Sequence, residues 1–184
     1  MMGMRKKLLF ILLLLCALPG YSQNNIQNKF FGCSWGSSMF WMRDALKSKN
    51  YSVFIENDDE LNAYDIRFGG NDWKFASFYY FKDCLYRISF SRNFETKKEM
   101  YSEFDYMRNK LIGKYESYES IYINEEPGID GLKNLFISDK NRDSVMLYCS
   151  YSRSIGGKMY YYLKLDYVNE ALYKKSENSN DEEL

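Results

Sequence analysis

The chain has 184 residues, among them 25 lysines and arginines, 25 aspartates and glutamates, and no histidine. The length fits one domain or two small halves, and the absence of histidine excludes every mechanism in which an imidazole moves a proton. Three basic residues belong to the leader described next, so the remainder carries 22 basic against 25 acidic residues. This mildly acidic balance makes nucleic acids and anionic membrane surfaces poor candidate partners.

The first 22 residues have the pattern of a secretory signal peptide. A basic segment at residues 5–7 precedes an apolar run at 8–18, and Gly20 and Ser22 are small residues of the kind that signal peptidases accept. We expect cleavage before Gln23 and a periplasmic or secreted protein. The apolar run is about half of the ~20 residues that cross a bilayer, and no later segment is longer, so no membrane span is predicted.

After the leader, 32 of the remaining 162 residues are Phe, Tyr or Trp, and the only proline is Pro127. Aromatic side chains fit a pleated, half-buried surface, whereas proline interrupts strand pairing. The composition therefore predicts a fold dominated by a β-sheet.

The first half of the chain begins with one predicted helix. Ser37 can cap a helix over residues 38–48, in which Met39, Met42 and Leu46 form one apolar stripe. Four strand-like runs follow, separated by tight turns, and they indicate an antiparallel meander: 51–55, 61–68, 73–81 and 84–91.

The second half repeats this order. Thr96 and Glu99 have the spacing of a capping box, which predicts a helix over 96–112 that ends at Gly113 and lays Met100, Phe104, Met107 and Leu111 on the sheet. Strands are expected over 114–123, 132–139, 144–152 and 158–168. The polar, acidic segment 176–184 is expected to form a disordered tail.

These elements predict an α+β fold made of two consecutive α-β4 units, residues 23–93 and 94–175, with an antiparallel sheet and the helices packed on one face. This order of elements resembles the fold of the β-lactamase inhibitor protein, in which tandem helix-plus-sheet units build one continuous sheet. The segment 31–38 and the tyrosine-rich last strand resemble small secreted Gram-negative proteins of unknown function. That second resemblance implies no activity.

No catalytic constellation is predicted. Residues 32–36 match the G-x-S-x-G pattern around Ser34, but the chain has neither a histidine base nor an S-x-x-K sequence, so these glycines are interpreted as the entry to the first helix. The acidic cluster at 56–60 lacks the spacing of a calcium loop, and Glu125 and Glu126 are expected in an exposed loop. We therefore expect no cofactor and no bound metal.

Cys33, Cys84 and Cys149 follow the leader, an odd number without a C-x-x-C pair. At most one internal disulfide can form among them, and buried free thiols are slightly favoured over that alternative. In the leader, Cys16 follows Leu15 instead of a small residue, so lipid attachment there is a less favoured alternative to cleavage.

Strict alternation along the strands divides the aromatic residues between two faces. One face is the predicted core: Tyr64, Ile66, Phe68, Trp73, Phe75, Tyr79, Ile88, Leu147, Tyr161, Leu163 and Leu165. The opposite face is expected to carry aromatic residues interleaved with Lys74, Arg87 and Lys164. The hypothetical partner-binding residues there are Phe78, Tyr80, Phe136, Tyr148, Tyr160 and Tyr162.

The sequence thus favours a non-enzymatic binding module of the cell envelope, whose partner is a protein or a glycan, since exposed tyrosines beside lysine or arginine are typical of interaction hot spots. The alternative is that a second layer, a dimer contact or the bend of the strands covers the same aromatic residues. Two further functions stay open: a small hydrolase that acts on glycans through two carboxylates, and a structural component of an envelope assembly.

Overall fold

The computed structural model describes residues 25–116, 121–126, 128 and 131–181. The predicted leader and its cleavage site before Gln23 lie outside the described residues, as do residues 182–184 of the predicted tail. The same holds for residues 117–120 of the predicted strand 114–123.

The first half contains a short hairpin, a helix and four strands. The hairpin, helix and strands are β1 (Lys29–Phe30), β2 (Cys33–Ser34), α2 (Met39–Lys47), β3 (Ser52–Asn57), β4 (Glu60–Phe68), β5 (Asn71–Phe81) and β6 (Cys84–Phe94). The helix cap is Ser38, whose side chain accepts a hydrogen bond from the Trp41 N–H. The prediction of Ser37 as the cap was therefore wrong by one residue; the Ser37 hydroxyl instead accepts a bond from the Ser34 N–H.

The described residues of the second half form a helix, four strands and a further helix. They are α3 (Lys97–Tyr115), β7 (Tyr122–Asn124), β8 (Asn134–Ser138), β9 (Asp143–Arg153), β10 (Met159–Asn169) and α4 (Glu170–Asp181). The capping box of Thr96 and Glu99 is confirmed. However, α3 does not end at Gly113: it continues to Tyr115, whose buried side chain joins the core. Residues 176–181 were expected to be disordered but belong to α4.

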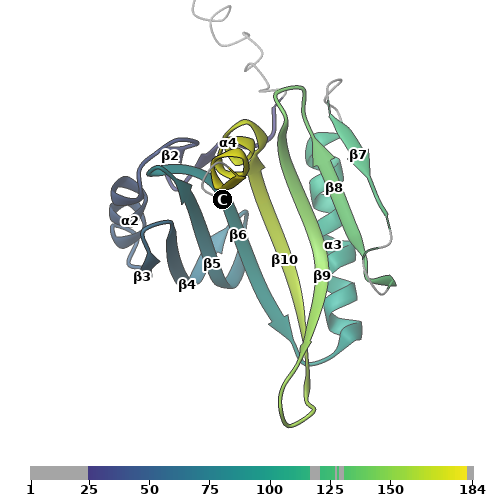
Figure 1. Cartoon of the computed structure of the whole chain (residues 1–184). Coiled ribbons are helices and arrows are strands. Elements are labelled where there is room, and N and C mark those ends of the chain that lie inside the picture. The colour runs from purple at the N-terminus through teal and green to yellow at the C-terminus, as the bar shows by residue number, and fades with distance from the viewer. Residues whose placement is uncertain (1–24, 117–120, 127, 129–130, 182–184) are drawn as a thin grey trace, which may run out of the picture.

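Eight strands form one antiparallel sheet in the order β3-β4-β5-β6-β10-β9-β8-β7 (Figure 1). The two halves meet in the middle, where β6 pairs with β10 in a register that places Phe90 opposite Leu165. The predicted α+β class with an antiparallel sheet and helices packed against it is thus confirmed.

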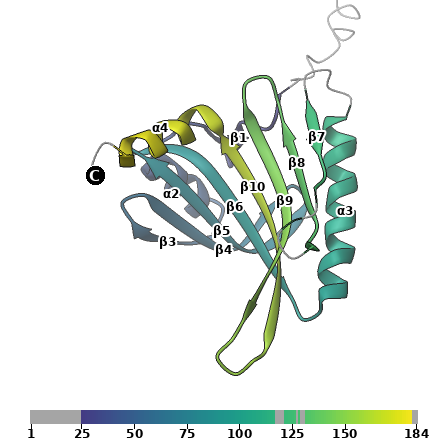
Figure 2. The same ribbon diagram turned by 45° about the vertical axis from the view of Figure 1, so that its right-hand side comes forward.

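The helices occupy both faces of the sheet (Figure 2). Helices α2 and α3 pack on what we call the helix face, where they cover the hydrophobic core. Helix α4 crosses the opposite face, called the open face here: Tyr173 of α4 lies 6.0 Å from Tyr86 between ring centroids, and the Ser144 hydroxyl lies 3.4 Å from Glu170 Oε1. The prediction that the helices share one face therefore holds for α2 and α3 but not for α4.

Aromatic side chains make the centre of the core. Phe68 and Phe90 stack with centroids 4.4 Å apart, and Phe30 of the β1–β2 hairpin packs against Trp35 at 4.9 Å and Tyr167 at 5.1 Å. Aromatic pairs at such distances add to the stabilisation from buried area. The hairpin thereby closes the core beneath α2.

The alternation of side chains reverses in the middle of β4 and β5. Asp65 adopts φ +49°, and the register passes from Tyr64↔Phe75 directly to Ile66↔Trp73. The register is the same on both sides of this point, so the strands stay aligned while their side chains exchange faces: Ala63 and Ala76 are buried on one side of it, and Ile66 and Trp73 on the other. For this reason Tyr64, Phe75 and Tyr79, which were predicted in the core, lie on the open face.

Candidate binding face of the sheet

The antiparallel register places one residue from each central strand in a line across the open face. From β4 to β9 these neighbours are Tyr64, Phe75, Ser91, Lys164 and Tyr148, and we call them the aromatic row. Helix α4 lies four residues further along the strands, over the line that contains Arg87 and Ser144. The aromatic row is therefore not covered by this helix.

Four of the six predicted partner-binding residues lie on the open face. Phe136, Tyr148, Tyr160 and Tyr162 are half-buried there. The other two predictions were wrong: Phe78 is 0 % exposed and Tyr80 is 2 % exposed, both within the core. The exchange of faces at Asp65 in β4, and opposite it in β5, puts these two side chains on the helix face.

The sequence analysis did not predict the aromatic residues that β3, β4 and β5 contribute to the open face. Tyr64 is 43 % exposed and lies between Phe54, at a centroid distance of 5.3 Å, and Phe75, at 5.2 Å. The three rings form a continuous apolar surface on β3, β4 and β5. The signal that could have located them is Asp65, since aspartate tolerates positive φ and so can mark an irregular position in a strand.

Lysine side chains lie over tyrosine rings where β9 and β10 form the open face. Lys164 Nζ is 5.9 Å from the ring centroid of Tyr148, and Lys158 Nζ is 5.2 Å from that of Tyr160. Such cation–π contacts hold the ammonium groups beside the rings without neutralising their charge. This part of the open face presents aromatic surface and positive charge together.

A buried ion pair lies between the aromatic row and α4. Arg87 Nη2 is 2.5 Å from Asp166 Oδ2, and the side chain of Asp166 is 0 % exposed. Burial by itself would lower the pKa of Arg87, but the charge of Asp166 and the hydrogen bond to it raise the pKa above its ordinary value. Burial, and then the charge of Asp166, raises the pKa of Tyr148, whose hydroxyl lies 3.4 Å from the same carboxylate.

The β9 end of the aromatic row opens into a pocket of about 490 Å³. Tyr148, Met146 and Ser150 of β9 line it, with Asn134 at the start of β8. Because β8 pairs with β9 only as far as Tyr148, the pocket lies where β9 continues without that neighbour. A side chain of a partner that contacts the aromatic row can enter this space.

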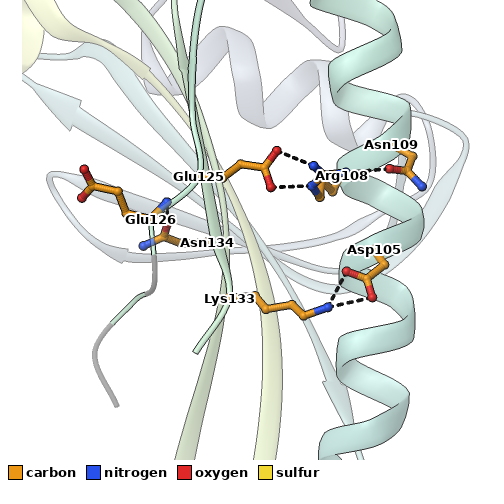
Figure 3. A network of polar contacts seen from close by, with 7 residues as sticks. All are labelled: Asp105, Arg108, Asn109, Glu125, Glu126, Lys133 and Asn134. Carbon is orange, nitrogen blue, oxygen red and sulfur yellow. Dashed lines mark hydrogen bonds and ion pairs between the residues drawn. The ribbon is translucent and has the colours of Figure 1, made fainter. Parts of the chain in front are cut away.

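A second pocket, of about 270 Å³, lies between α3, the residues that follow β7 and the residues that lead into β8. It collects carboxylates, but two ion pairs bind them (Figure 3): Lys133 Nζ is 2.5 Å from Asp105 Oδ1, and Arg108 makes a bidentate pair with Glu125. The side chain of Glu126 points away from both cations (Figure 3). These contacts fasten α3 to the adjoining strand segments.

Ser34 and three cysteines are the nucleophiles that the sequence analysis considered. Ser34 lies in the exposed part of the β1–β2 hairpin. Cys33, Cys84 and Cys149 are free thiols, and burial raises the pKa of Cys33 and brings that of Cys149 to about 12. Since the thiolate is the reactive form, neither of these two buried cysteines is poised for chemistry at neutral pH.

Within the described ranges, the structure has no group of three or more histidine, cysteine, aspartate or glutamate side chains that could hold a metal ion. No helix among the described residues is both long and apolar enough to cross a membrane. Comparison of the chain with protein-family models, with curated proteins and with solved structures finds no match in any of the three. Both resemblances noted from the sequence therefore stay predictions.

Proposed function

We propose that this protein is a non-enzymatic binding module of the cell envelope, and that its aromatic row contacts a protein or glycan partner. The observation that carries the proposal is the line from Tyr64 to Tyr148, which joins ring surface and the Lys164 ammonium on a part of the sheet that α4 leaves uncovered. Tyrosine provides a large contact area at little conformational cost, and a neighbouring cation adds specificity.

The other proposed functions receive less support from the geometry. A carboxylate-dependent glycan hydrolase needs one carboxyl group as acid and a second as base or nucleophile. In the pocket where carboxylates gather, Asp105 and Glu125 are each bound to a cation. A structural role in an envelope assembly stays compatible with the same contact face, and differs from the leading proposal in the size of the complex that is captured.

The test compares variants of the aromatic row in partner capture. Immobilised protein should retain its partner from an envelope fraction, and Tyr64→Ser and Lys164→Gln should each reduce the retained amount about tenfold or more, because hot-spot residues dominate binding. Tyr106→Ser is the matched control, since Tyr106 is exposed on α3, which packs on the helix face. Tyr148 is unsuitable for this comparison because its hydroxyl contacts buried Asp166.

Thermal unfolding of the same variants separates binding from folding. The proposal expects unfolding midpoints close to that of the unaltered protein for Tyr64→Ser and Lys164→Gln. If both variants retain the partner as well as Tyr106→Ser does, the aromatic row is not the contact. If Tyr64→Ser instead unfolds at a much lower temperature, the Phe54–Tyr64–Phe75 stack belongs to the folding core and the proposed site is abandoned.

A further inference from the structure

The β9–β10 hairpin projects beyond the rest of the sheet (Figures 1 and 2). Strand β8 pairs with β9 only as far as Tyr148, and β6 pairs with β10 only from Tyr161 onward. Between these points the hairpin is a two-stranded ribbon, in which Arg153 lies opposite Met159. Its tip is therefore the part of the described molecule that reaches furthest from the core at this end of the sheet.

The charge of this region differs from that of the chain as a whole. Between Asp143 and Asp166 the sequence contains Arg153, Lys158 and Lys164 and no acidic residue. No ion pair with an acidic side chain is found for these three cations within the described part of the chain. The hairpin is thus locally basic on a protein whose remaining surface is acidic on balance.

An apolar residue stands at the tip. The turn is closed by hydrogen bonds from the Ser154 N–H to the Lys158 carbonyl and from the Gly157 N–H to the Ser154 carbonyl, both 2.9 Å. Ile155 is fully exposed within it. Turns of this kind favour Gly, Asn, Asp or Ser, so the turn itself does not require isoleucine at this position. Arg153 and Lys158 lie directly behind it, at the two strand ends.

We propose that this tip docks on an anionic lipid surface, with Ile155 in the boundary between headgroups and acyl chains and with Arg153 and Lys158 on lipid phosphates. The arrangement has an apolar end followed by cations, which matches the order of hydrocarbon and phosphate in a bilayer leaflet. The acidic balance of the rest of the chain repels the same surface, so contact is confined to the hairpin end. The aromatic row then stays accessible above the membrane.

Vesicle sedimentation tests this inference on the chain that begins at Gln23, which contains every described element and lacks the apolar leader. The vesicles are phosphatidylcholine alone, and equal parts of phosphatidylcholine and phosphatidylglycerol. The protein is expected to bind the mixed vesicles, to bind the neutral ones at least about tenfold more weakly, and to release as salt is raised. Ile155→Ser should weaken binding to the mixed vesicles about tenfold or more. Arg153→Gln with Lys158→Gln should weaken it about as strongly.

Matched controls carry the same chemical changes elsewhere. Ile55→Ser removes an exposed isoleucine from β3, and Lys47→Gln with Lys49→Gln removes two exposed lysines near the end of α2. Both controls should bind the mixed vesicles as the unaltered protein does, and so should Tyr64→Ser, which separates this inference from the proposed function. Absence of binding to mixed vesicles, equal binding to neutral ones, or equal losses in the hairpin variants and in the controls would each overturn it.

Discussion

Asp143 is buried at the start of β9, where its Oδ1 accepts a hydrogen bond of 2.7 Å from Asn169 Nδ2. Burial, followed by the charge of neighbouring Asp139, raises the pKa of Asp143 from 3.8 to about 6. The folded protein therefore holds this proton more tightly than the unfolded chain does. The resulting stabilisation is fully present below about pH 3.8 and is lost as the pH rises through about 6.

Asp143→Asn should consequently raise the free energy of unfolding above pH 6, by up to about 3 kcal/mol, and change it little near pH 4. Urea unfolding at a series of pH values measures this difference. Asp58→Asn serves as the control, because it removes a charge from an exposed turn. A variant that is less stable than the unaltered protein at pH 7 would show that the carboxylate is needed in its charged form.

At the scale of elements, Gly113 lies inside α3, where it contributes no strain. It does not adopt a positive φ, and a Cβ built at this position meets no atom within 4 Å. Gly113→Ala should therefore raise the free energy of unfolding by about 0.5–1 kcal/mol, since glycine loses more backbone freedom on folding than alanine.

The same substitution at Gly36 provides the contrast, because Gly36 adopts φ +79°. Gly36→Ala should lower the stability although its Cβ also meets open space. The midpoints of urea unfolding of Gly113→Ala and Gly36→Ala test both predictions. A loss of stability in Gly113→Ala would mean that α3 does not continue through this residue in solution.

Local signals in the sequence predict the helices and strands well. They predict which face of the sheet a side chain occupies only where the strand alternates regularly. The capping box at Thr96 and the turns between strands depend on neighbouring residues, which the sequence displays directly. Alternation also gives the correct face in β9 and β10, where Tyr148 and Tyr160 lie on the open side. It fails for Phe78, because the side chains exchange faces at Asp65 and opposite it in β5. An aspartate tolerates positive φ, but its presence in a strand does not by itself predict that it adopts one.

Helix α4 was missed for a related reason. Asn169 provides a cap, since its Oδ1 accepts a hydrogen bond of 2.9 Å from the Leu172 N–H. The residues that follow are mostly polar and show no broad apolar stripe, so composition favoured a disordered tail. What holds the helix is contact with the sheet, such as that of Tyr173 with Tyr86, and such distant contacts are not readable from the local sequence.

At the scale of the whole molecule, the two α-β4 units share one sheet and one hydrophobic core. We therefore expect a single cooperative unfolding transition. Trp35, Trp41 and Trp73 all lie in the first unit, so tryptophan fluorescence follows that unit, whereas far-ultraviolet circular dichroism follows both. The two signals should give the same urea midpoint, and distinct midpoints would show that the units unfold independently.

The order of strands in the sheet also sets the order in which a nascent chain can complete it. Strand β6 is finished early, yet its partner β10 is the last strand of the chain. Until residues 159–169 emerge, β6 keeps an unpaired edge that can recruit strands from other molecules. Folding therefore ends at the centre of the sheet instead of its margin. A chain truncated before β10 would leave the edge of β6 exposed and would be prone to aggregate. During synthesis, the edge of β6 must stay free of other strands until the chain is almost complete.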